Sequence, residues 1–472
     1  MSSDFRETLY TIDQRGHRKW VYPTEIVGFF KARRRIIASL LLAFYLLMPW
    51  ISIGEYQAIH LDIFNRRFVF FGNVFWATDT KYLFLSLFTL GLTLFLFTSL
   101  FGRVWCGWAC PQTVFLEFVF RPIEQLIEGS FSQRKKLDEQ PWNLKKLRIK
   151  LTKYIIFIIL AWFIANTFLA YFLGRERLIG MMTSSPLDNL STFILSNIMT
   201  GVVLFEFGWF REQFCTVLCP YARFQSVLLD DSSVIVGYDA IRGEPRSKVS
   251  KSAGGEESPK GDCVDCGLCV RVCPTGIDIR NGLQLECVQC ASCIDACDSI
   301  MTKLGRPLGL IRYDSEKGLK GDLKKLIRPR TVVYASVWLL VISVFGYLIL
   351  NRKLSEASIF HSRSGHLFSM SQVVGEEGIV VNHLELHIEN KGVEVNRYSV
   401  KVDDSSDSSL SAIKLVLPVD PFPVQPNKFQ QIPVFAKFPV GLLVNGKRSI
   451  TLIVTDSKDF TKKLKVDLLG AG

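Results

Sequence analysis

Eight cysteines between residues 263 and 297 constrain this chain more than any other feature. They form two runs with the spacing Cys-x2-Cys-x2-Cys-x3-Cys, the first followed by Pro274 and the second by Asp298. This spacing is typical of a fold that holds two [4Fe–4S] clusters, in which the fourth cysteine of each run binds the cluster of the other run. The predicted ligands are Cys263, Cys266, Cys269 and Cys297 for one cluster, and Cys287, Cys290, Cys293 and Cys273 for the other.

Two alternatives fit eight thiols in this register less well. Paired zinc sites usually take four thiols in two separated pairs. A disulfide framework needs an oxidising compartment, and none of the twelve cysteines of the chain falls within residues 352–472, the part that we expect outside the cell membrane. The spacing therefore predicts a chain that carries electrons.

The chain also has the composition of a membrane protein. Hydrophobic residues make up 49% of its 472 residues, and its mean hydropathy of +0.23 is high for a soluble protein. Five segments are long enough to cross about 30 Å of hydrocarbon. They comprise residues 36–53, 83–101, 154–174, 190–210 and 331–351. We therefore predict an α-helical bundle of about five transmembrane spans.

Basic residues predict the orientation of this bundle. Residues 1–35 hold eight Lys or Arg and residues 102–153 hold ten, whereas residues 54–82 and 174–189 hold three and two. The positive-inside rule places the two basic segments in the cytoplasm of a bacterial inner membrane. Five spans then put the cluster segment in the cytoplasm and the C-terminal part in the periplasm. Anionic lipid head groups, rather than nucleic acid, explain the net charge of +12.

Two shorter motifs contain the other four cysteines. Cys106-x3-Cys110-Pro follows the second predicted span, and Cys215-x3-Cys219-Pro follows the fourth. On a helix this spacing puts both sulfurs of a pair on one face, and the proline would break or kink the helix just beyond. Four soft thiolates that converge at the membrane surface could hold Cu(I) or another thiophilic metal, or could act as a dithiol. The alternative is that they are small buried hydrophobic residues.

Composition changes along the chain predict its domains. We expect an N-terminal segment (1–35), a membrane bundle of four helices (36–241), a linker (242–261), a ferredoxin-like domain (262–312), a fifth membrane helix (331–351) and an exterior domain (352–472). Residues 134–150 are strongly basic, and we expect them to form a helix on the inner leaflet. Glu206 is charged although it lies in the fourth span, and we expect it to reach the interface or to pair with Arg211.

Residues 352–472 have the pattern of an all-β domain. Short β-branched runs with alternating polarity are separated by Pro, Gly, Asn, Asp and Ser. The runs comprise residues 379–391, 393–402, 412–419, 429–438, 448–455 and 462–468. Asn445-Gly446, between two of them, is a signal for a two-residue hairpin. The number of strands favours an immunoglobulin-like sandwich, here without the Cys and Trp hallmarks.

In combination, these motifs resemble those of one family. The resemblance rests on Tyr22-Pro-Thr-Glu-Ile-Val-Gly28, on residues 101–113 and 211–225, on the paired cluster motif, and on the β-type tail after a final span. The chain is similar in these respects to the CcoG family, also called FixG or RdxA, of accessory proteins for assembly of cbb-type cytochrome c oxidase. The resemblance covers nearly the whole chain, and Asp298 after the last cluster cysteine is usual for that family.

The resemblance implies a function and a set of partners. It implies that the chain reduces Cu(II) to Cu(I) on the cytoplasmic side, with the eight cysteines as cluster ligands and electron conduit. Cys106, Cys110, Cys215 and Cys219 would then be candidates for copper handling or a thiol relay. The expected partners are copper ions, a cytoplasmic electron donor, and oxidase subunits or copper transporters. Thiolates favour Cu(I) over Cu(II), which is compatible with this product.

Two other functions stay open on the sequence alone. A membrane electron carrier resembling NapH would move electrons between quinol and a reductase; it shares both cysteine motifs but lacks the fifth span and the exterior β domain. A non-catalytic scaffold would use the clusters for rigidity and the β domain to dock oxidase subunits. No dinucleotide-binding glycine pattern or nucleophile elbow is visible, so the electron donor is expected to be a separate partner.

Overall fold

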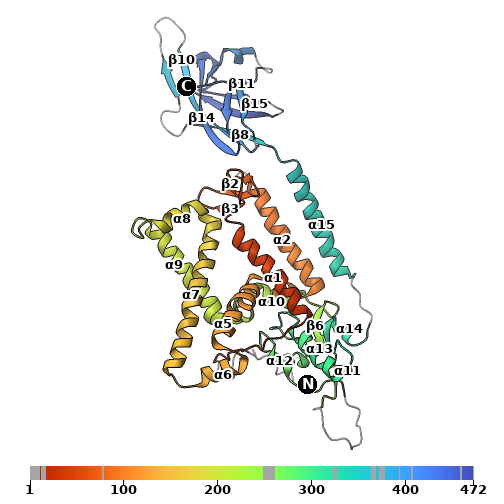
Figure 1. The fold of residues 1–472 in the computed structure, drawn as a ribbon. Coiled ribbons are helices and arrows are strands. Elements are labelled where there is room, and N and C mark those ends of the chain that lie inside the picture. Colours follow the sequence, from red (N-terminus) through yellow and green to blue (C-terminus); the bar gives the residue numbers. More distant parts are fainter. Residues whose placement is uncertain are drawn as a thin grey trace, which may run out of the picture. The chain divides into compact units, whose positions relative to one another are not determined.

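The protein consists of two structural units. The computed structural model describes residue 11 and residues 17–76, 79–247, 261–322, 327–362, 368–371, 378–392, 394–404, 408–457 and 460–470. The two units are Met1–Phe345 and Gly346–Gly472. The first contains long helices and all the cysteine motifs, and the second is built mainly of strands (Figure 1). Most of the predicted linker 242–261 lies outside the described residues.

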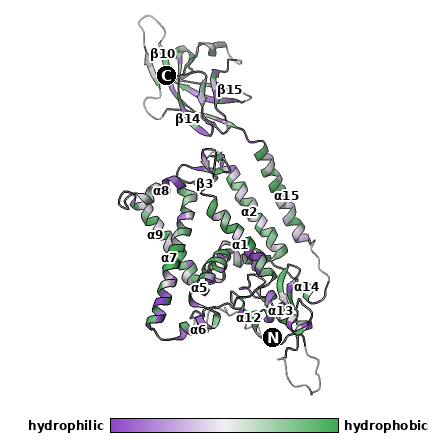
Figure 2. Cartoon of the chain, in the orientation of Figure 1, coloured by the Kyte–Doolittle hydropathy of each residue, from purple (hydrophilic) through white to green (hydrophobic). Residues whose placement is uncertain are grey.

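Four helices in the described part of the chain are long and apolar enough to cross a membrane. They are α2 (Thr80–Phe101), α7 (Leu144–Leu173), the helix Leu190–Phe210 and α15 (Pro329–Leu350). The third is made of α9 (Leu190–Phe205) and the π-helical turn η4 (Glu206–Phe210). Hydrophobic residues cover most of the length of α2 and α15, whereas the first turns of α7 are hydrophilic (Figure 2). These helices contain the second to fifth predicted spans almost completely.

The first predicted span, residues 36–53, corresponds to a helix that differs from expectation. Helix α1 (Phe29–Leu47) begins earlier and ends earlier than predicted, and its first two turns carry Lys31 and three arginines. Only its second part is apolar, so it does not belong to the four helices above. Nineteen residues of α-helix nevertheless extend about 28 Å, close to the thickness of the hydrocarbon layer.

The contacts of α1 place it between the cluster segment and α7. At its start, the backbone N–H groups of Phe30 and Lys31 donate to the carboxylate of Asp295, at 3.1 and 2.8 Å. An acidic group at this position compensates the positive end of the helix dipole. Near its end, the hydroxyl of Tyr45 donates to the carbonyl of Ile164 in α7, at 2.8 Å. Helix α1 therefore extends from the cluster segment to the second half of α7.

Short elements complete the helical unit. Between α1 and α2 lie β1 (Ser52–Ile53), β2 (Tyr56–Gln57), β3 (Ile59–Asp62), β4 (Arg67–Phe70) and β5 (Asn73–Phe75). Between α2 and α9 lie α3 (Val104–Trp108), α4 (Pro111–Phe115), η3 (Leu116–Phe120), α5 (Arg121–Glu128), α6 (Phe131–Glu139) and α8 (Arg175–Thr183). The π-helical turn η5 (Phe214–Leu218) and α10 (Pro220–Leu228) follow η4.

The cluster segment is a small fold with its own core. It comprises α12 (Leu268–Arg271), η6 (Ile279–Asn281) and α13 (Ser292–Leu304), together with α11 (Ala240–Gly243) and α14 (Glu316–Leu319). Strand β6 (Ile235–Tyr238) pairs antiparallel with β7 (Ile311–Asp314) and joins residues on both sides of the cysteine runs. Its apolar core includes Val236, Ile277, Ile294 and Leu310, all nearly inaccessible to solvent.

The second unit is a sandwich of two antiparallel sheets. One sheet has the order β12-β14-β10-β8, with β9 also paired to β10, and the other has the order β13-β11-β15-β16. Their bounds are β8 Ser355–His361, β9 Phe368–Ser371, β10 Ile379–Asn390, β11 Asn396–Val402, β12 Lys414–Val416, β13 Phe422–Val424, β14 Lys428–Pro439, β15 Lys447–Asp456 and β16 Thr461–Leu469. All six predicted runs are strands; β8, β9 and β13 were not predicted.

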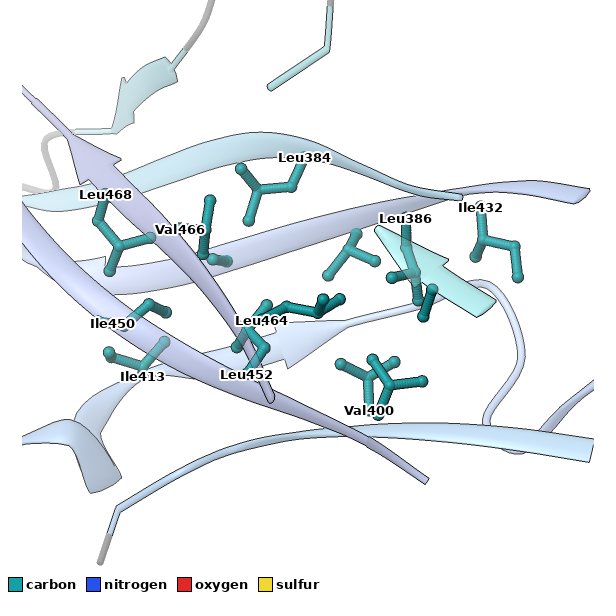
Figure 3. Close-up of a cluster of buried hydrophobic side chains, with 14 of the residues drawn as sticks. Leu384, Leu386, Val400, Ile413, Ile432, Ile450, Leu452, Leu464, Val466 and Leu468 are labelled. Carbon is teal, nitrogen blue, oxygen red and sulfur yellow. The ribbon is translucent and has the colours of Figure 1, made fainter. Parts of the chain in front are cut away.

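Alternating side chains of both sheets form the core of the sandwich. Leu384 and Leu386 on one sheet face Ile450 and Leu452 on the other (Figure 3), and all four are almost fully buried. The period of two along each strand places every second residue in this layer. The predicted hairpin turn is also present, since Asn445 and Gly446 both have positive φ angles, 52° and 74°.

Leu386→Ala tests this core. Leu386 is 0% exposed and pairs with Ile432 on the neighbouring strand, so truncation should lower the free energy of unfolding of the sandwich by about 2–5 kcal/mol. Hydrogen–deuterium exchange of the full chain should show faster exchange of peptides from β10 and β14. Val416→Ala, at a position 42% exposed, is the control and should change little. Equal exchange in both variants would contradict this packing.

Candidate metal centres

The eight clustered cysteines gather around two cavities. The first cavity is lined by the first predicted ligand set, Cys263, Cys266, Cys269 and Cys297, with Tyr238 and Met301. The second is lined by Cys273, Cys287, Cys290 and Cys293, and by Cys269 at its edge. The last cysteine of each run thus lies at the cavity of the other run, as expected for two [4Fe–4S] clusters with exchanged ligands.

The two runs share an unusual backbone conformation. In each run, the residues directly before and after the second cysteine have positive φ angles. These residues are Asp265 (48°) and Gly267 (64°) beside Cys266, and Gln289 (54°) and Ala291 (61°) beside Cys290. Left-handed residues in such turns direct successive backbone N–H groups into one concavity, which favours a negatively charged group. A cluster bound by thiolates is such a group, so the backbone suits it.

Because these thiols are buried, they ionise only when a bound cation compensates the charge of the thiolate. Burial raises the pKa of Cys269, Cys287 and Cys297 to about 12, because a thiolate loses its hydration there. At neutral pH these sulfurs become thiolates only when a positively charged metal replaces the proton. Of the twelve cysteines, all of which the structure describes, Cys266 alone is exposed. The residues therefore fit a pair of buried iron–sulfur clusters with one edge near solvent.

The four remaining cysteines lie in two similar helix–turn–helix segments. Cys106 is in α3 and Cys215 is in η5, whereas Cys110 and Cys219 are extended residues that precede α4 and α10. The prediction of one continuous helix per pair is therefore wrong. Proline at the first position of a helix is compatible with helical geometry, so each Cys-Pro step begins a new helix.

These four thiols converge although they come from two motifs more than 100 residues apart. Cys215 lies close enough to Cys106, Cys110 and Cys219 for their charges to interact. The amide of Gln225, itself 0% exposed, donates to the sulfur of Cys106 over 3.4 Å. Backbone N–H groups of Gln112 and Thr113 donate to the sulfur of Cys110. The donors make this a polar site for sulfur rather than a set of apolar fillers.

The segment between Cys106 and Cys110 is packed directly on the second cluster loop. A Cβ atom added to Gly107 would lie 2.9 Å from the backbone nitrogen of Cys290 and 2.8 Å from its Cα. The guanidinium of Arg34 holds both sides, since it donates to the carbonyl of Gly107 at 2.8 Å and to the hydroxyl of Ser292 at 3.3 Å. Only a glycine permits this approach.

Two aromatic side chains reinforce the same junction. The indole N–H of Trp108 donates to the hydroxyl of Tyr313 at 2.9 Å, and this hydroxyl donates to the carbonyl of Gln289 at 2.7 Å. The side-chain carbonyl of Gln289 in turn accepts from the backbone N–H of Arg103 at 2.9 Å. Arg103, before the first thiol motif, is therefore bonded directly to the loop that carries Cys287 and Cys290, and Trp108, within the motif, is bonded to it through Tyr313.

A buried network of ion pairs lies beside the second thiol motif. Glu124 accepts hydrogen bonds from the guanidinium of Arg211 at 2.8 and 3.0 Å. Lys153 and Arg134 lie 3.3 and 3.6 Å from the same carboxylate. Burial by itself would raise the pKa of Glu124, but the three cations outweigh it and lower this pKa to about 2. Glu124 therefore stays ionised and compensates the charge of its neighbours.

A second arginine joins this network to the cluster segment. Arg121, 3% exposed, donates to the carboxylate of Glu212 at 3.2 Å and to the carbonyl of Pro274 at 3.0 Å. Pro274 directly follows Cys273, and Glu212 lies three residues before Cys215. The side chain of Arg121 thus connects a predicted cluster ligand to the second thiol motif.

Two charged parts of the chain differ from expectation. Of the two outcomes expected for Glu206, pairing with Arg211 is wrong, because its carboxylate accepts from the amide of Gln112 at 2.6 Å and the guanidinium of Arg211 is directed to Glu124. Residues 134–150 do not form one surface helix, because α6 ends at Glu139 and α7 begins at Leu144. Lys150 lies 2.7 Å from the carboxylate of Glu128, so the basic run is partly neutralised by buried acids within the protein.

Glu124→Gln tests the network. Removing one carboxylate leaves three buried cations with incomplete compensation, so the free energy of unfolding should fall by about 3–5 kcal/mol. Denaturant titration followed by iron–sulfur absorbance measures this change. Glu139→Gln, in an exposed pair with Lys135, should cost less than about 1 kcal/mol, and an equal loss in both variants would contradict the prediction.

The same variant has a predicted pH dependence. The pKa of Glu124 is lowered from 4.5 to about 2, so its contribution to stability is complete above about pH 4.5 and disappears as the pH falls toward 2. The difference in stability between wild type and Glu124→Gln should shrink over this interval.

Three family models match different parts of the chain. A model described as "4Fe-4S dicluster domain" matches residues 210–316, and one described as "4Fe-4S binding domain" matches residues 83–136. A third, described as an "IG-like fold at C-terminal of FixG", matches residues 345–470. These matches confirm the predictions of iron–sulfur clusters and of an immunoglobulin-like C-terminal domain.

Relatives of this chain match over most of its length. "Nitrogen fixation protein FixG" of Rhizobium meliloti is 32% identical and covers 93% of this chain and 90% of its own. "Protein RdxA" of Cereibacter sphaeroides is 35% identical over 82% of each chain. A crystal structure of a FixG-related protein from Vibrio parahaemolyticus, 21% identical, covers 25% of this chain and 96% of its own with a TM-score of 0.20. Because the first two relatives match at this identity over nearly their full lengths, the chain belongs to the FixG/RdxA family of membrane iron–sulfur electron-transfer proteins.

Proposed function

We propose that this protein reduces Cu(II) to Cu(I) at the cytoplasmic face of the inner membrane, for the assembly of cbb-type cytochrome c oxidase. The observation that carries the proposal is the pair of cysteine-lined cavities packed against a convergent set of four membrane-edge thiols. The cavities are suited to storing single electrons, and the four thiols place further sulfur between them and the membrane helices.

In this function the chain's own residues hold the clusters and insulate them. Cys263, Cys266, Cys269 and Cys297 would hold one cluster, and Cys273, Cys287, Cys290 and Cys293 the other. Bound there, iron–sulfur clusters accept and release one electron each. The left-handed residues beside Cys266 and Cys290 would direct N–H groups into the cavities, and the apolar core would exclude water. Such hydrogen bonds and burial are what adjust cluster potentials.

The exposed Cys266 marks the side from which electrons would enter. We expect the donor to be a soluble protein that gives up one electron at a time. The balance is then simple: the donor loses one electron, Cu(II) gains one and becomes Cu(I), and no covalent bond of the protein forms or breaks. The other cysteines are more buried than Cys266, which would protect the stored electron from water and oxygen.

A cavity of about 280 Å³ beside the second cluster loop would admit Cu(II). Four carboxylates line it, those of Asp230, Asp231, Glu286 and Glu316, together with the guanidinium of Arg103. The carboxylate of Asp230 is paired with Arg328, so Asp231, Glu286 and Glu316 supply the excess negative charge. Carboxylate oxygens suit Cu(II) better than Cu(I). Gln289 lines both this cavity and the cysteine cavity, so an ion held there would be separated from the second cluster by little more than one side chain.

The choice among functions rests on the C-terminal unit and the last helix. NapH-like carriers are expected to lack both, whereas this chain has α15 and a match to the C-terminal fold of FixG over residues 345–470. We expect the sandwich to lie in the periplasm, where it could contact oxidase subunits or copper transporters. The many basic residues of the cytoplasmic flanks favour this orientation.

Copper reduction can be measured directly. Purified protein with reduced clusters should convert Cu(II) to Cu(I), detected as a coloured Cu(I)–bicinchoninate complex, with one Cu(I) formed per electron stored. Ser in place of Cys287, Cys290 and Cys293 should reduce the initial rate by at least about tenfold, since the second cluster is lost. Thr302→Ala, which changes an exposed hydroxyl on α13, the helix that also carries Cys293, is the control. An unchanged rate in the triple variant would refute the proposal.

The acidic cavity makes a separate prediction about affinity. Asp231→Asn combined with Glu316→Gln should raise the Cu(II) concentration needed for half-maximal rate several-fold, because two negative charges are removed from the approach. Iron content and the maximal rate should stay unchanged. Glu176→Gln, an exposed carboxylate on α8, is the matched control. If the double variant and the control behave alike, copper does not approach through this cavity.

A further inference from the structure

The segment 83–136 matches a [4Fe–4S] binding domain but does not contain enough cysteines to hold a cluster by itself. The dicluster domain match over residues 210–316 contains the eight cysteines that two clusters require. The separate "4Fe-4S binding domain" match over residues 83–136 contains only two cysteines, Cys106 and Cys110. A [4Fe–4S] cluster needs four protein ligands. Two further sulfurs must therefore come from another part of the chain if a cluster is bound there.

The structure supplies these two sulfurs. We propose that Cys106, Cys110, Cys215 and Cys219 together hold a third [4Fe–4S] cluster at the membrane edge. The second pair comes from outside the matched segment, and two contacts bring it to the first pair. Gln225, on the helix that follows Cys219, donates to the sulfur of Cys106 at 3.4 Å, and Gln112, two residues after Cys110, donates to the carbonyl of Arg211 at 3.0 Å. All twelve cysteines of the chain then form three sets of four.

The arrangement of the four thiols does not suit a single bound ion. Among the described residues, no three Cys, His, Asp or Glu side chains are arranged to hold one metal ion. This holds equally for the eight cysteines around the two cavities, which are spaced for clusters. A single Cu(I) or Zn(II) needs sulfurs about 2.3 Å from one centre, whereas a cubane holds its four ligands farther apart. The membrane-edge thiols resemble the cluster cysteines in this respect.

The surroundings of the thiols match the needs of a cluster. Four thiolates around a cubane carry a net negative charge, which a buried site must compensate. Gln225 donates to the sulfur of Cys106, and the N–H groups of Gln112 and Thr113 at the start of α4 donate to that of Cys110. The buried guanidinium of Arg103 lies near enough to attract a charge on Cys106. Hydrogen bonds to sulfur and a nearby cation are the usual second layer of such sites.

The position of the site gives the third cluster a role. Gly107, between two of its ligands, is packed on the backbone of Cys290, a predicted ligand of the second cluster. An electron would thus cross from the second to the third cluster over a short path, with one oxidised as the other is reduced. This direction rests on the proposed function, but the presence of the cluster does not.

Iron counting on the full chain tests the proposal. After anaerobic purification in detergent and reconstitution with iron and sulfide, wild type should contain about twelve irons and twelve sulfides per chain. A variant with Ser at Cys106, Cys110, Cys215 and Cys219 should retain about eight. Mössbauer spectroscopy of wild type should assign all the iron to cubane clusters. Copper reduction is not measured in this experiment. The third cluster can therefore be refuted while copper reduction stands, and copper reduction can be refuted while the third cluster stands.

A matched variant calibrates the loss of one cluster. Ser at Cys263, Cys266, Cys269 and Cys297 should also remove about four irons, because these cysteines are the predicted ligands of one [4Fe–4S] cluster. Correct folding of the membrane-edge variant is checked by electron paramagnetic resonance, since the magnetic coupling between the two remaining clusters should persist in it and disappear in the calibrating variant. Cys215→Ser alone provides a milder change if the fourfold variant does not fold.

Three results would overturn the proposal. The first is about eight irons in wild type and no change in the membrane-edge variant. The second is a count near ten with a Mössbauer signature of a two-iron cluster. The third is copper or zinc bound to the four thiols, seen by X-ray absorption at the copper or zinc edge.

Discussion

The close contact between Gly107 and the backbone of Cys290 is the constraint on which the rest of the first unit depends. It fixes the cluster segment against the membrane helices at the place where both carry cysteines. Arg34, buried and bonded to both sides, and the Trp108–Tyr313–Gln289 hydrogen bonds hold this contact. These contacts hold the loop of Cys287 and Cys290 directly on the segment of Cys106 and Cys110, so the two groups of cysteines are joined by a packed interface.

The sequence predicts the chemistry of the site better than its backbone. Cysteine spacing reports directly which sulfurs share a cavity, because each Cys-x2-Cys step allows only a tight turn. It cannot report that Gln289 and Ala291 adopt positive φ angles, since Gln and Ala do not usually signal left-handed turns. The Cys-Pro steps were misread for a related reason: proline ends one helix but is equally suited to begin the next.

Charge patterns mislead where the partner of a charged residue lies far away in sequence. The basic run 134–150 indicates a lipid-facing helix if it is read alone, yet Glu128 and Glu124 draw its cations inward. In the second unit, alternating runs predicted the long strands, because burial on one face determines their period. The short strands β12 and β13 have three residues each; one was found inside a longer run and the other was missed, since three residues carry too little pattern.

The carboxylate that caps α1 has a consequence for how the protein is made. Asp295 lies between Cys293 and Cys297 on α13, and it accepts the first N–H groups of the helix that leads into the bilayer. Because two predicted cluster ligands flank Asp295, any ordering of α13 by a bound cluster would also hold this cap in place. Cofactor insertion and the docking of α1 would then be thermodynamically linked, since both depend on the same turn of α13.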